Sequence, residues 1–343
     1  MFAPLEILEV DGAKVGPHPP AAVTLPELAR GGVRLALGTV FTEPDGTGPE
    51  GYPAGDVERA AAKGRAQVEV YLTWRDKGAV GLDLRRVCRG DPGVGQVRGG
   101  MGVAEVVPQP VAERLKRPLH LGILVENADP IRGPEELGWW VERGVVAVGL
   151  AWAKASRYAG GNGTELGLTD LGREMVREMD RLGVVHDLSH LSDRAMDELL
   201  GMTGRPVIAS HSNSRALLGG GGFGENQRHL RDETIREIAR RGGVIGLNLF
   251  SAFLRPALGD GGRGDVADCV RHIEHLCEVA GSRAHIGLGS DMDGGFSAAR
   301  LPRGIERAGD VGALAEALSA RGWSDEEVEG FAWGNWVRFW GGA

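Results

Sequence analysis

The segment VVHDLSHLSDRAMDELL (residues 184–200), followed by PVIASHSNSRAL (residues 206–217), decides the fold. A short apolar run from Val184 changes into a pattern whose apolar residues recur at helical spacing, and a second apolar run starts at Pro206. Short apolar runs that alternate with amphipathic helices are typical of parallel sheets. The segment therefore predicts a strand, a covering helix and the next parallel strand.

The same alternation extends over much of the chain. Eight apolar runs are the predicted strands: residues 5–10, 33–41, 120–126, 145–152, 184–190, 206–211, 244–250 and 285–291. Eight parallel strands with intervening helices match a (β/α)₈ TIM barrel, which reaches 343 residues as one domain. We therefore expect a single barrel domain over residues 1–343, while residues 77–117 carry no clear pattern.

Two predicted helices carry clear terminal signals. Thr169 precedes a helical stripe of apolar residues as an N-cap, and Gly183 follows it as a C-cap. Ser324 and Glu327 stand in capping-box order before a tryptophan-rich C-terminal segment. We expect this last helix to close the barrel, and a further helix to cover residues 55–76.

Composition and charge exclude several classes of function. The formal net charge is -8 and the isoelectric point is near 5.7, with Lys and Arg scattered along the chain. This pattern indicates no contact with nucleic acid or with an anionic membrane. Three scattered cysteines favour a reducing compartment, and no run approaches the roughly 18 apolar residues of a membrane span. We expect a cytoplasmic protein with a small-molecule substrate, and its oligomeric state stays open, with a homodimer as one option.

Four predicted strands end on a polar side chain, and a barrel places such strand ends at its catalytic face. These residues are Glu126, His190, His211 and Asp291. One carboxylate and two imidazoles form a ligand set that suits a divalent metal such as zinc. Asp291 would then act as a general base toward a water activated by the metal.

Purely structural roles are the alternative to these functional assignments. A lone histidine at a strand end is more often a hydrogen-bonded structural residue, so the argument rests on His190 and His211 occurring together. Asp187 suits either the orientation of a metal ligand or the capping of a turn. Arg228 lies in a polar loop, where a solvated arginine is expected.

A second histidine pair, His272 and His275, occurs in RHIEHLCEVAG (residues 271–281). The two residues are three positions apart in a predicted outer helix, whereas the helical metal-binding pair is four apart. We therefore expect no metal site there.

Four motifs occur in order: VVHDLSHLSDRAMDELL, PVIASHSNSRAL, RHLRDETIREIARRGGVIGLNLF (residues 228–250) and HIGLGSDMDGG (residues 285–295). Together they resemble the renal or membrane dipeptidase family of zinc peptidases, peptidase family M19. The resemblance runs from about residue 118 to GNWVRFW (residues 334–340), roughly two-thirds of the chain. It implies a (β/α)₈ barrel of the metal-dependent hydrolase type, with two zinc ions bridged by a glutamate, that hydrolyses dipeptides.

The resemblance also implies roles for individual residues. Glu126 corresponds to the bridging carboxylate, and His190 and His211 to the other ligands of one zinc ion. Arg228 corresponds to the arginine that holds the substrate carboxylate, a task that suits a bidentate guanidinium. Asp291 corresponds to the acid/base aspartate.

The chain departs from the family pattern at four positions. The family binds its other zinc through a His-x-Asp pair after the first strand, and Ala13 and Val15 stand in those places. Neither side chain can ligate a metal, so we expect one zinc ion per chain. Trp152 stands where many members have a histidine that stabilises the tetrahedral intermediate. Asn127 replaces a glycine.

Two functions therefore remain in competition. The first is a metal-dependent hydrolase that cleaves dipeptides or related small amides with a single zinc. The second is a catalytically impaired homologue that binds a small molecule. A different barrel hydrolase is a third option, because fold alone does not determine function. The hydrolase is favoured because the chain retains five residues of the family's site: Glu126, His190, His211, Arg228 and Asp291.

Overall fold

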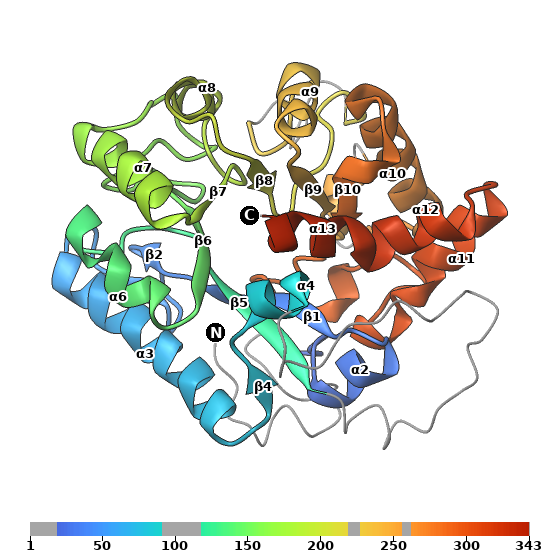
Figure 1. Cartoon of the computed structure of the whole chain (residues 1–343), viewed down its shortest axis with the longest axis horizontal. Coiled ribbons are helices and arrows are strands. Elements are labelled where there is room, and N and C mark those ends of the chain that lie inside the picture. The colour runs from blue at the N-terminus through green and yellow to red at the C-terminus, as the bar shows by residue number, and fades with distance from the viewer. Residues whose placement is uncertain (1–18, 91–117, 219–226, 256–261, 343) are drawn as a thin grey trace.

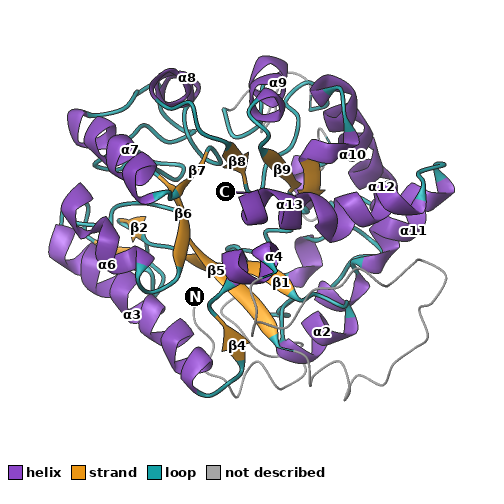
Figure 2. Ribbon diagram, in the orientation of Figure 1, coloured by secondary structure: helices purple, strands orange, loops and turns teal. Residues whose placement is uncertain are grey.

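The computed structural model describes residues 19–90, 118–218, 227–255 and 262–342 (Figure 1). An eight-stranded parallel sheet forms its centre, and most helices surround this sheet (Figure 2). The pairing order is β1-β5-β6-β7-β8-β9-β10, and β4 pairs with the start of β5. The strands are β1 Leu35–Val40, β4 Val80–Gly81, β5 Leu119–Val125, β6 Val145–Gly149, β7 Val185–Asp187, β8 Val207–Ala209, β9 Val244–Leu247 and β10 Ile286–Leu288.

Seven of the eight predicted strands are present in the described part of the chain. Several end earlier than predicted, because the polar residues at their carboxyl ends leave the ladder and turn into loops. β7, for example, ends at Asp187, and His190 already has a left-handed φ of 68°. The predicted strand 5–10 lies outside the described residues. The described strands therefore form a curled parallel sheet, and closure into a full barrel stays a prediction.

The helices follow the strands in the order that the alternating pattern predicts. A small second sheet, β2 Glu43–Pro44 with β3 Gly51–Tyr52, lies between β1 and the first long helix. The helices are α2 Leu25–Arg30, α3 Val57–Asp76, α4 Leu84–Arg89, α6 Leu137–Val141, α7 Asp170–Leu182, α8 Asp193–Met202, α9 Asp232–Arg240, α10 Val266–Ala280, α11 Gly312–Ala320, α12 Asp325–Glu329 and α13 Asn335–Gly342.

The predicted helix ends are confirmed where the side chains specify them. The Thr169 side chain accepts a hydrogen bond from the backbone N–H of Gly172 at the start of α7, and Gly183 ends this helix with a φ of 69°. Ser324 and Glu327 form a reciprocal capping box at the start of α12. These contacts are local, so the sequence alone was sufficient to predict them.

Two clusters of apolar side chains pack against the sheet, one on each face. The larger one lies between the strands and the surrounding helices. The smaller one joins one residue from each of five neighbouring strands to Phe339 and Trp340 of α13 and to Leu84 of α4; the strand residues are Leu124, Ala147, Val185, Ile208 and Val244. Figure 1 shows α13 and α4 together across the sheet. The C-terminal helix thus packs against one face of the sheet, and its role in closing a barrel stays a prediction.

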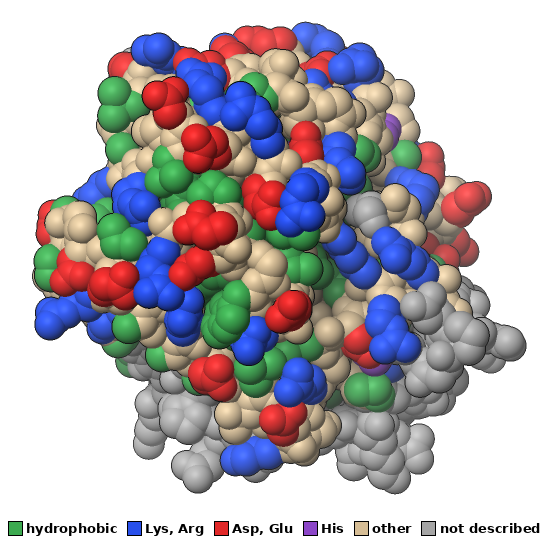
Figure 3. All heavy atoms as spheres, turned by 60° about the vertical axis from the view of Figure 1, so that its left-hand side comes forward, with side chains coloured by type: hydrophobic (Ala, Val, Ile, Leu, Met, Phe, Trp, Pro, Cys, Tyr) green, Lys and Arg blue, Asp and Glu red, His purple; other side chains and the backbone are tan. Residues whose placement is uncertain are grey.

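Charges of both signs are interspersed on the face drawn in Figure 3. Many are paired along single helices, such as Arg181 with Glu178 and Arg240 with Glu237. Among the described residues, no helix has the length and apolar character needed to cross a membrane.

Candidate metal centre

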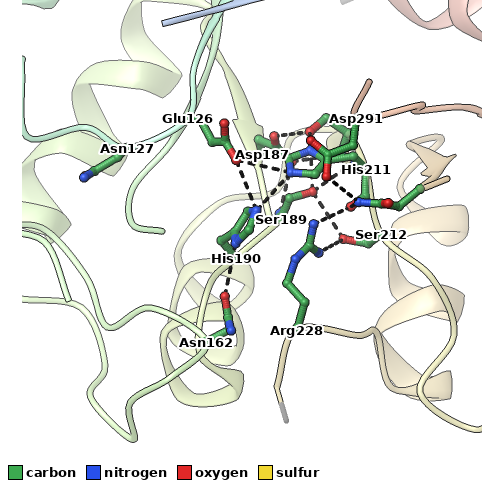
Figure 4. Close-up of polar contacts among 12 residues, drawn as sticks. Glu126, Asn127, Asn162, Asp187, Ser189, His190, His211, Ser212, Arg228 and Asp291 are labelled. Carbon is green, nitrogen blue, oxygen red and sulfur yellow. Dashed lines mark hydrogen bonds and ion pairs between the residues drawn. The ribbon is translucent and has the colours of Figure 1, made fainter. Parts of the chain in front are cut away.

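Three side chains from different strand ends converge at one point (Figure 4). Glu126 directly follows β5, His190 lies three residues beyond β7, and His211 lies two residues beyond β8. The Nε2 atoms of the two histidines are 3.0 Å apart. Oε1 of Glu126 lies 3.1 Å from Nε2 of His190 and 3.3 Å from Nε2 of His211. All three predicted metal ligands are therefore in reach of a single ion.

The parallel sheet explains this convergence. Carboxyl ends of parallel strands meet at one edge, so a polar residue placed just after each apolar strand reaches the same space. The side chains are largely enclosed, with exposed fractions of 14% for Glu126, 9% for His190 and 8% for His211. Such enclosure strengthens electrostatic interactions between them.

Hydrogen bonds fix the orientation of both imidazole rings. Nδ1 of His190 lies 3.1 Å from Oδ1 of Asn162, whose backbone N–H also donates to the carbonyl of His190 at 2.7 Å. Nδ1 of His211 lies 2.6 Å from Oγ of Ser210. The Ser210 hydroxyl donates to Asp187, so its oxygen accepts the Nδ1 proton of His211. Both rings therefore present Nε2 to Glu126.

This arrangement suits a bound cation. With Nδ1 protonated, each neutral ring turns an Nε2 lone pair toward the other ring and toward the carboxylate of Glu126. Three facing lone pairs repel one another unless a metal ion or an extra proton lies between them. Two imidazole nitrogens and one carboxylate oxygen match the ligands of catalytic zinc sites, which keep one position open. The described residues contain no other such cluster of metal-binding side chains.

The electrostatics of the three residues favour a charged carboxylate with at least one neutral ring. Burial opposes ionisation of Glu126, but hydrogen bonds to His190 and His211 outweigh it and lower the pKa of Glu126. Burial and the positive charge of Arg228 lower the pKa of His190 to about 3. Burial also disfavours the charged form of His211, yet the charge of Asp291 and the contact with Glu126 raise its pKa overall.

Arg228 and Asp291 lie on the side of the cluster formed by β8, β9 and β10. Arg228 is 4% exposed, so the expectation of a solvated side chain is wrong. Its guanidinium donates to Oγ of Ser212 at 3.1 Å and to the carbonyl of His211 at 2.8 Å, and it stacks over the ring of Phe253. The side-chain amide of Asn248 donates a hydrogen bond to Oδ2 of Asp291 at 2.9 Å.

Asp291 has two features that are common in catalytic groups. Its backbone adopts a left-handed φ of 57°, a conformation that is uncommon for non-glycine residues and recurs at active sites, although Asp adopts it more readily than most residues. Burial and the nearby charge of Glu126 raise the pKa of its carboxyl group. A carboxylate with a raised pKa accepts a proton more readily near neutral pH.

Other residues singled out in the sequence take structural positions. Asp187 accepts hydrogen bonds from the backbone N–H groups of Ser189 and Ser210 and from the Ser210 hydroxyl, so it caps a turn and orients a ligand at once. Nε2 of His272 contacts the carbonyl of Leu254, and His275 lies 3.7 Å from Asp232. These two histidines therefore have separate partners, a backbone carbonyl and an aspartate.

The departures from the family pattern differ in their consequences. Asn127 points away from the cluster (Figure 4) and donates to the carbonyl of Thr42 at 2.9 Å. Trp152, in contrast, lies beside the metal ligands, with its ring 5.8 Å from that of His190. Ala13 and Val15 lie outside the described residues.

Sequence reasoning missed three residues that hold the site together: Asn162, Ser210 and Asn248. Asn162 lies in a glycine-rich loop 28 positions before His190, and no spacing rule links the two. Ser210 had a signal, because it directly precedes His211 within the same strand end. Asn248 follows β9 as the other site residues follow their strands, so the same strand-end rule would have found it.

The chain belongs to the membrane dipeptidase family, peptidase family M19, whose sequence profile matches residues 4–343. An uncharacterized dipeptidase of Schizosaccharomyces pombe is 34% identical over 193 residues, which cover 55% of this chain and 43% of that protein. Dipeptidase 3 of Mus musculus is 33% identical over 172 residues, covering 50% of this chain and 32% of that protein. The aligned segments thus span less than half the length of these curated relatives.

Solved structures share the fold over almost the whole chain. The probable dipeptidase PvdM from Pseudomonas aeruginosa has a TM-score of 0.75 at 20% identity, covering 99% of this chain and 92% of that one. A metallopeptidase from Rhodobacter sphaeroides, liganded with a phosphinate mimic of the dipeptide L-Ala-D-Ala, has a TM-score of 0.74 at 24% identity, covering 98% and 92%. At these identities the likeness supports the fold alone.

Proposed function

We propose that this protein is a zinc-dependent dipeptidase that works with a single metal ion inside one closed (β/α)₈ barrel domain. The observation that carries the proposal is the convergence of Glu126, His190 and His211, with Nε2 atoms 3.0 Å apart beside a carboxylate. Membership in the membrane dipeptidase family supports the substrate class. We further propose that the protein acts in the cytoplasm, since its three scattered, free cysteines suit a reducing compartment.

Each residue of the site has a proposed task. Glu126, His190 and His211 would hold the ion, while Asn162 and Ser210 keep the two rings in the tautomer that binding requires. Zinc bound there would supply a Lewis acid for the amide carbonyl and would lower the pKa of a water molecule.

The other half of the site would handle the substrate and the proton. Arg228 would bind the carboxylate of the dipeptide, because its guanidinium is held rigidly by Ser212 and by the carbonyl of His211. Asp291 would accept the proton of the attacking water and return it to the leaving amine. Asn248 holds the acceptor carboxylate in place through Oδ2, so proton transfer needs no large movement.

The alternative, a catalytically impaired homologue that only binds a small molecule, has less support. It would require no acid/base group, yet Asp291 keeps a left-handed backbone and a raised pKa beside the metal cluster.

The test is to count zinc and to measure dipeptide hydrolysis on the same preparation. We expect one equivalent of zinc per chain, with hydrolysis that is lost on chelation and restored by zinc. His211→Ala should lose both the metal and the activity. His275→Ala, a histidine change outside the site, should keep both. Full zinc loading without cleavage of any dipeptide would favour the binding-protein alternative.

The number of zinc ions per chain can be tested separately by substitutions at two positions. Ala13 and Val15 stand where the family has its His-x-Asp pair, so the double change Ala13→His with Val15→Asp should raise the zinc content toward two. Trp152→His added to this pair is the fairer test of activity, since it also restores the family histidine. Two equivalents in the unchanged protein would contradict the single-ion proposal.

A further inference from the structure

Two aromatic rings line the metal centre on one side. Phe41 directly follows β1, and Trp152 lies in the loop after β6. Their ring centroids are 5.1 Å apart in an edge-to-face arrangement, and the Trp152 ring lies 5.8 Å from that of His190. Both rings are only partly buried, so a surface of each remains for a ligand.

The pairing order of the strands places this pair opposite the charged residues. Phe41 and Trp152 follow β1 and β6, the two neighbours of β5, which ends next to Glu126. Arg228 lies in the loop after β8, and Asp291 lies in the loop after β10. In this strand order Glu126 follows β5 on the side of the two rings, His211 follows β8 on the side of Arg228, and His190 follows β7 between them. The loops at the carboxyl ends of the strands are thus apolar on one side of the metal centre and charged on the other.

The two rings are held in place by their neighbours. Gln67 of α3 accepts a hydrogen bond from the backbone N–H of Phe41 at 2.8 Å and donates to its carbonyl at 2.6 Å. The backbone carbonyl of Trp152 lies so close to Gly161 that a Cβ there would approach its oxygen to 1.8 Å. The next residue, Asn162, binds His190. The part of the loop between β6 and α7 that presents Trp152 is therefore packed against the part of the same loop that orients a metal ligand.

We propose that Phe41 and Trp152 form an apolar subsite for the side chain of the N-terminal residue of the dipeptide. The inference rests on the proposed function. A dipeptide whose carboxylate binds Arg228 and whose amide lies at Glu126, His190 and His211 must extend its first residue past the metal centre, toward the two rings. Aromatic faces favour apolar groups and disfavour a carboxylate, because the face of the ring carries negative potential.

The subsite sets a preference among substrates. Leu-Ala should be cleaved with a kcat/KM at least about tenfold above that of Gly-Ala, the lower end of the range for apolar pockets that gain several carbon atoms. Glu-Ala should fall below Gly-Ala, since its carboxylate would lose water against the two rings. Trp152 also stands where the family has a histidine, so a polar residue at this position should remove the preference.

The experiment uses the zinc-loaded full-length protein and these three dipeptides. It also measures the affinity of the phosphinate mimics of Leu-Ala and Gly-Ala by calorimetry, which needs no turnover. Trp152→Ala, Trp152→His and Phe41→Ala should bring the ratio of Leu-Ala to Gly-Ala toward one, in both kcat/KM and affinity. Trp152→Phe should keep it. Trp139→Ala serves as the matched control, because Trp139 of α6 stacks with Arg65 of α3 and with Arg143, apart from the site.

The outcomes separate the two proposals. A ratio near one in the unchanged protein, or a ratio that survives the Trp152 and Phe41 changes, overturns the subsite while leaving dipeptide hydrolysis standing. Selective binding of the Leu-Ala mimic that depends on Trp152, without hydrolysis, supports the subsite and overturns the proposed function. Absence of both binding and hydrolysis overturns the two together.

Discussion

Two buried serines, Ser210 and Ser212, have different partners although they are two positions apart. Ser210 accepts the Nδ1 proton of His211, whereas Ser212 accepts from Arg228. Ser210→Ala should weaken zinc binding by about 10–100-fold, the usual cost of losing a group that orients a metal ligand. Ser212→Ala should leave zinc affinity unchanged and raise KM for dipeptides. Zinc titrations with a competing chelator and steady-state kinetics check both variants; equal losses of zinc affinity would contradict the division.

The pKa of His211 determines how zinc binding depends on pH. Although burial disfavours its charged form, the charges of Asp291 and Glu126 raise the pKa of His211 above its ordinary value. A protonated ring cannot bind zinc, so protons compete with the metal below this raised pKa. Zinc affinity should therefore begin to fall at a pH above about 6.5, the ordinary histidine value.

Zinc affinity measured between pH 5 and 9 checks this expectation. Asp291→Asn removes the charge that raises the pKa of His211, so it should move the fall in affinity to lower pH. A fall that stays at the same pH in this variant would show that Asp291 does not set the ionisation of His211.

At the scale of single elements, a buried asparagine joins the start of α13 to β10 and the turn before it. Nδ2 of Asn335 donates to the carbonyls of Arg283 and Ile286 at 2.8 and 2.7 Å, and Asn335 is buried. Asn335→Ala would leave these acceptors without the donor, so it should lower the free energy of unfolding by about 2 kcal/mol. Glu326→Ala, an exposed change on α12, should stay within about 0.5 kcal/mol. Denaturant unfolding measures both.

The elements themselves were largely predictable, and their lengths were not. α7 begins and ends where Thr169 and Gly183 predict, because a cap needs only neighbours in sequence. β7 covers only Val185–Asp187 of the run predicted at 184–190, because the end of a strand depends on where its partner stops. Leu188 still donates to the carbonyl of Ile208 on β8, but His190 turns out of the sheet.

At the scale of the whole molecule, the metal centre lies apart from the apolar core. The three ligands follow the carboxyl ends of β5, β7 and β8, in loops beyond the strands whose apolar side chains form the two core clusters. The protein without zinc should therefore stay folded and unfold in one cooperative step, with a lower Tm because bound zinc stabilises only the native state. Calorimetry with and without a chelator checks this; loss of the unfolding transition on chelation would mean that the metal is structural.

The sequence by itself determined the alternation of strands and helices from residue 118 onward, two helix N-caps and four of the five residues proposed for the site, while Arg228 came from the family resemblance. The first three features depend on local periodicity or on a polar residue that ends an apolar strand, and a parallel sheet brings such ends to one edge. Nothing local distinguishes Asn127, which points away, from Glu126, which belongs to the cluster.

Only the tertiary structure decided which atoms meet. It placed Asn162 against His190 across 28 positions of the chain, buried Arg228 against Ser212, and joined Trp152 to Phe41 beside the metal ligands. The first and the last of these contacts join loops from different strands, the second joins distant positions of one long loop, and their geometry depends on how the sheet curls and how the helices pack. Such distances are set by the packing of the whole chain, so no pattern within a short segment can encode them.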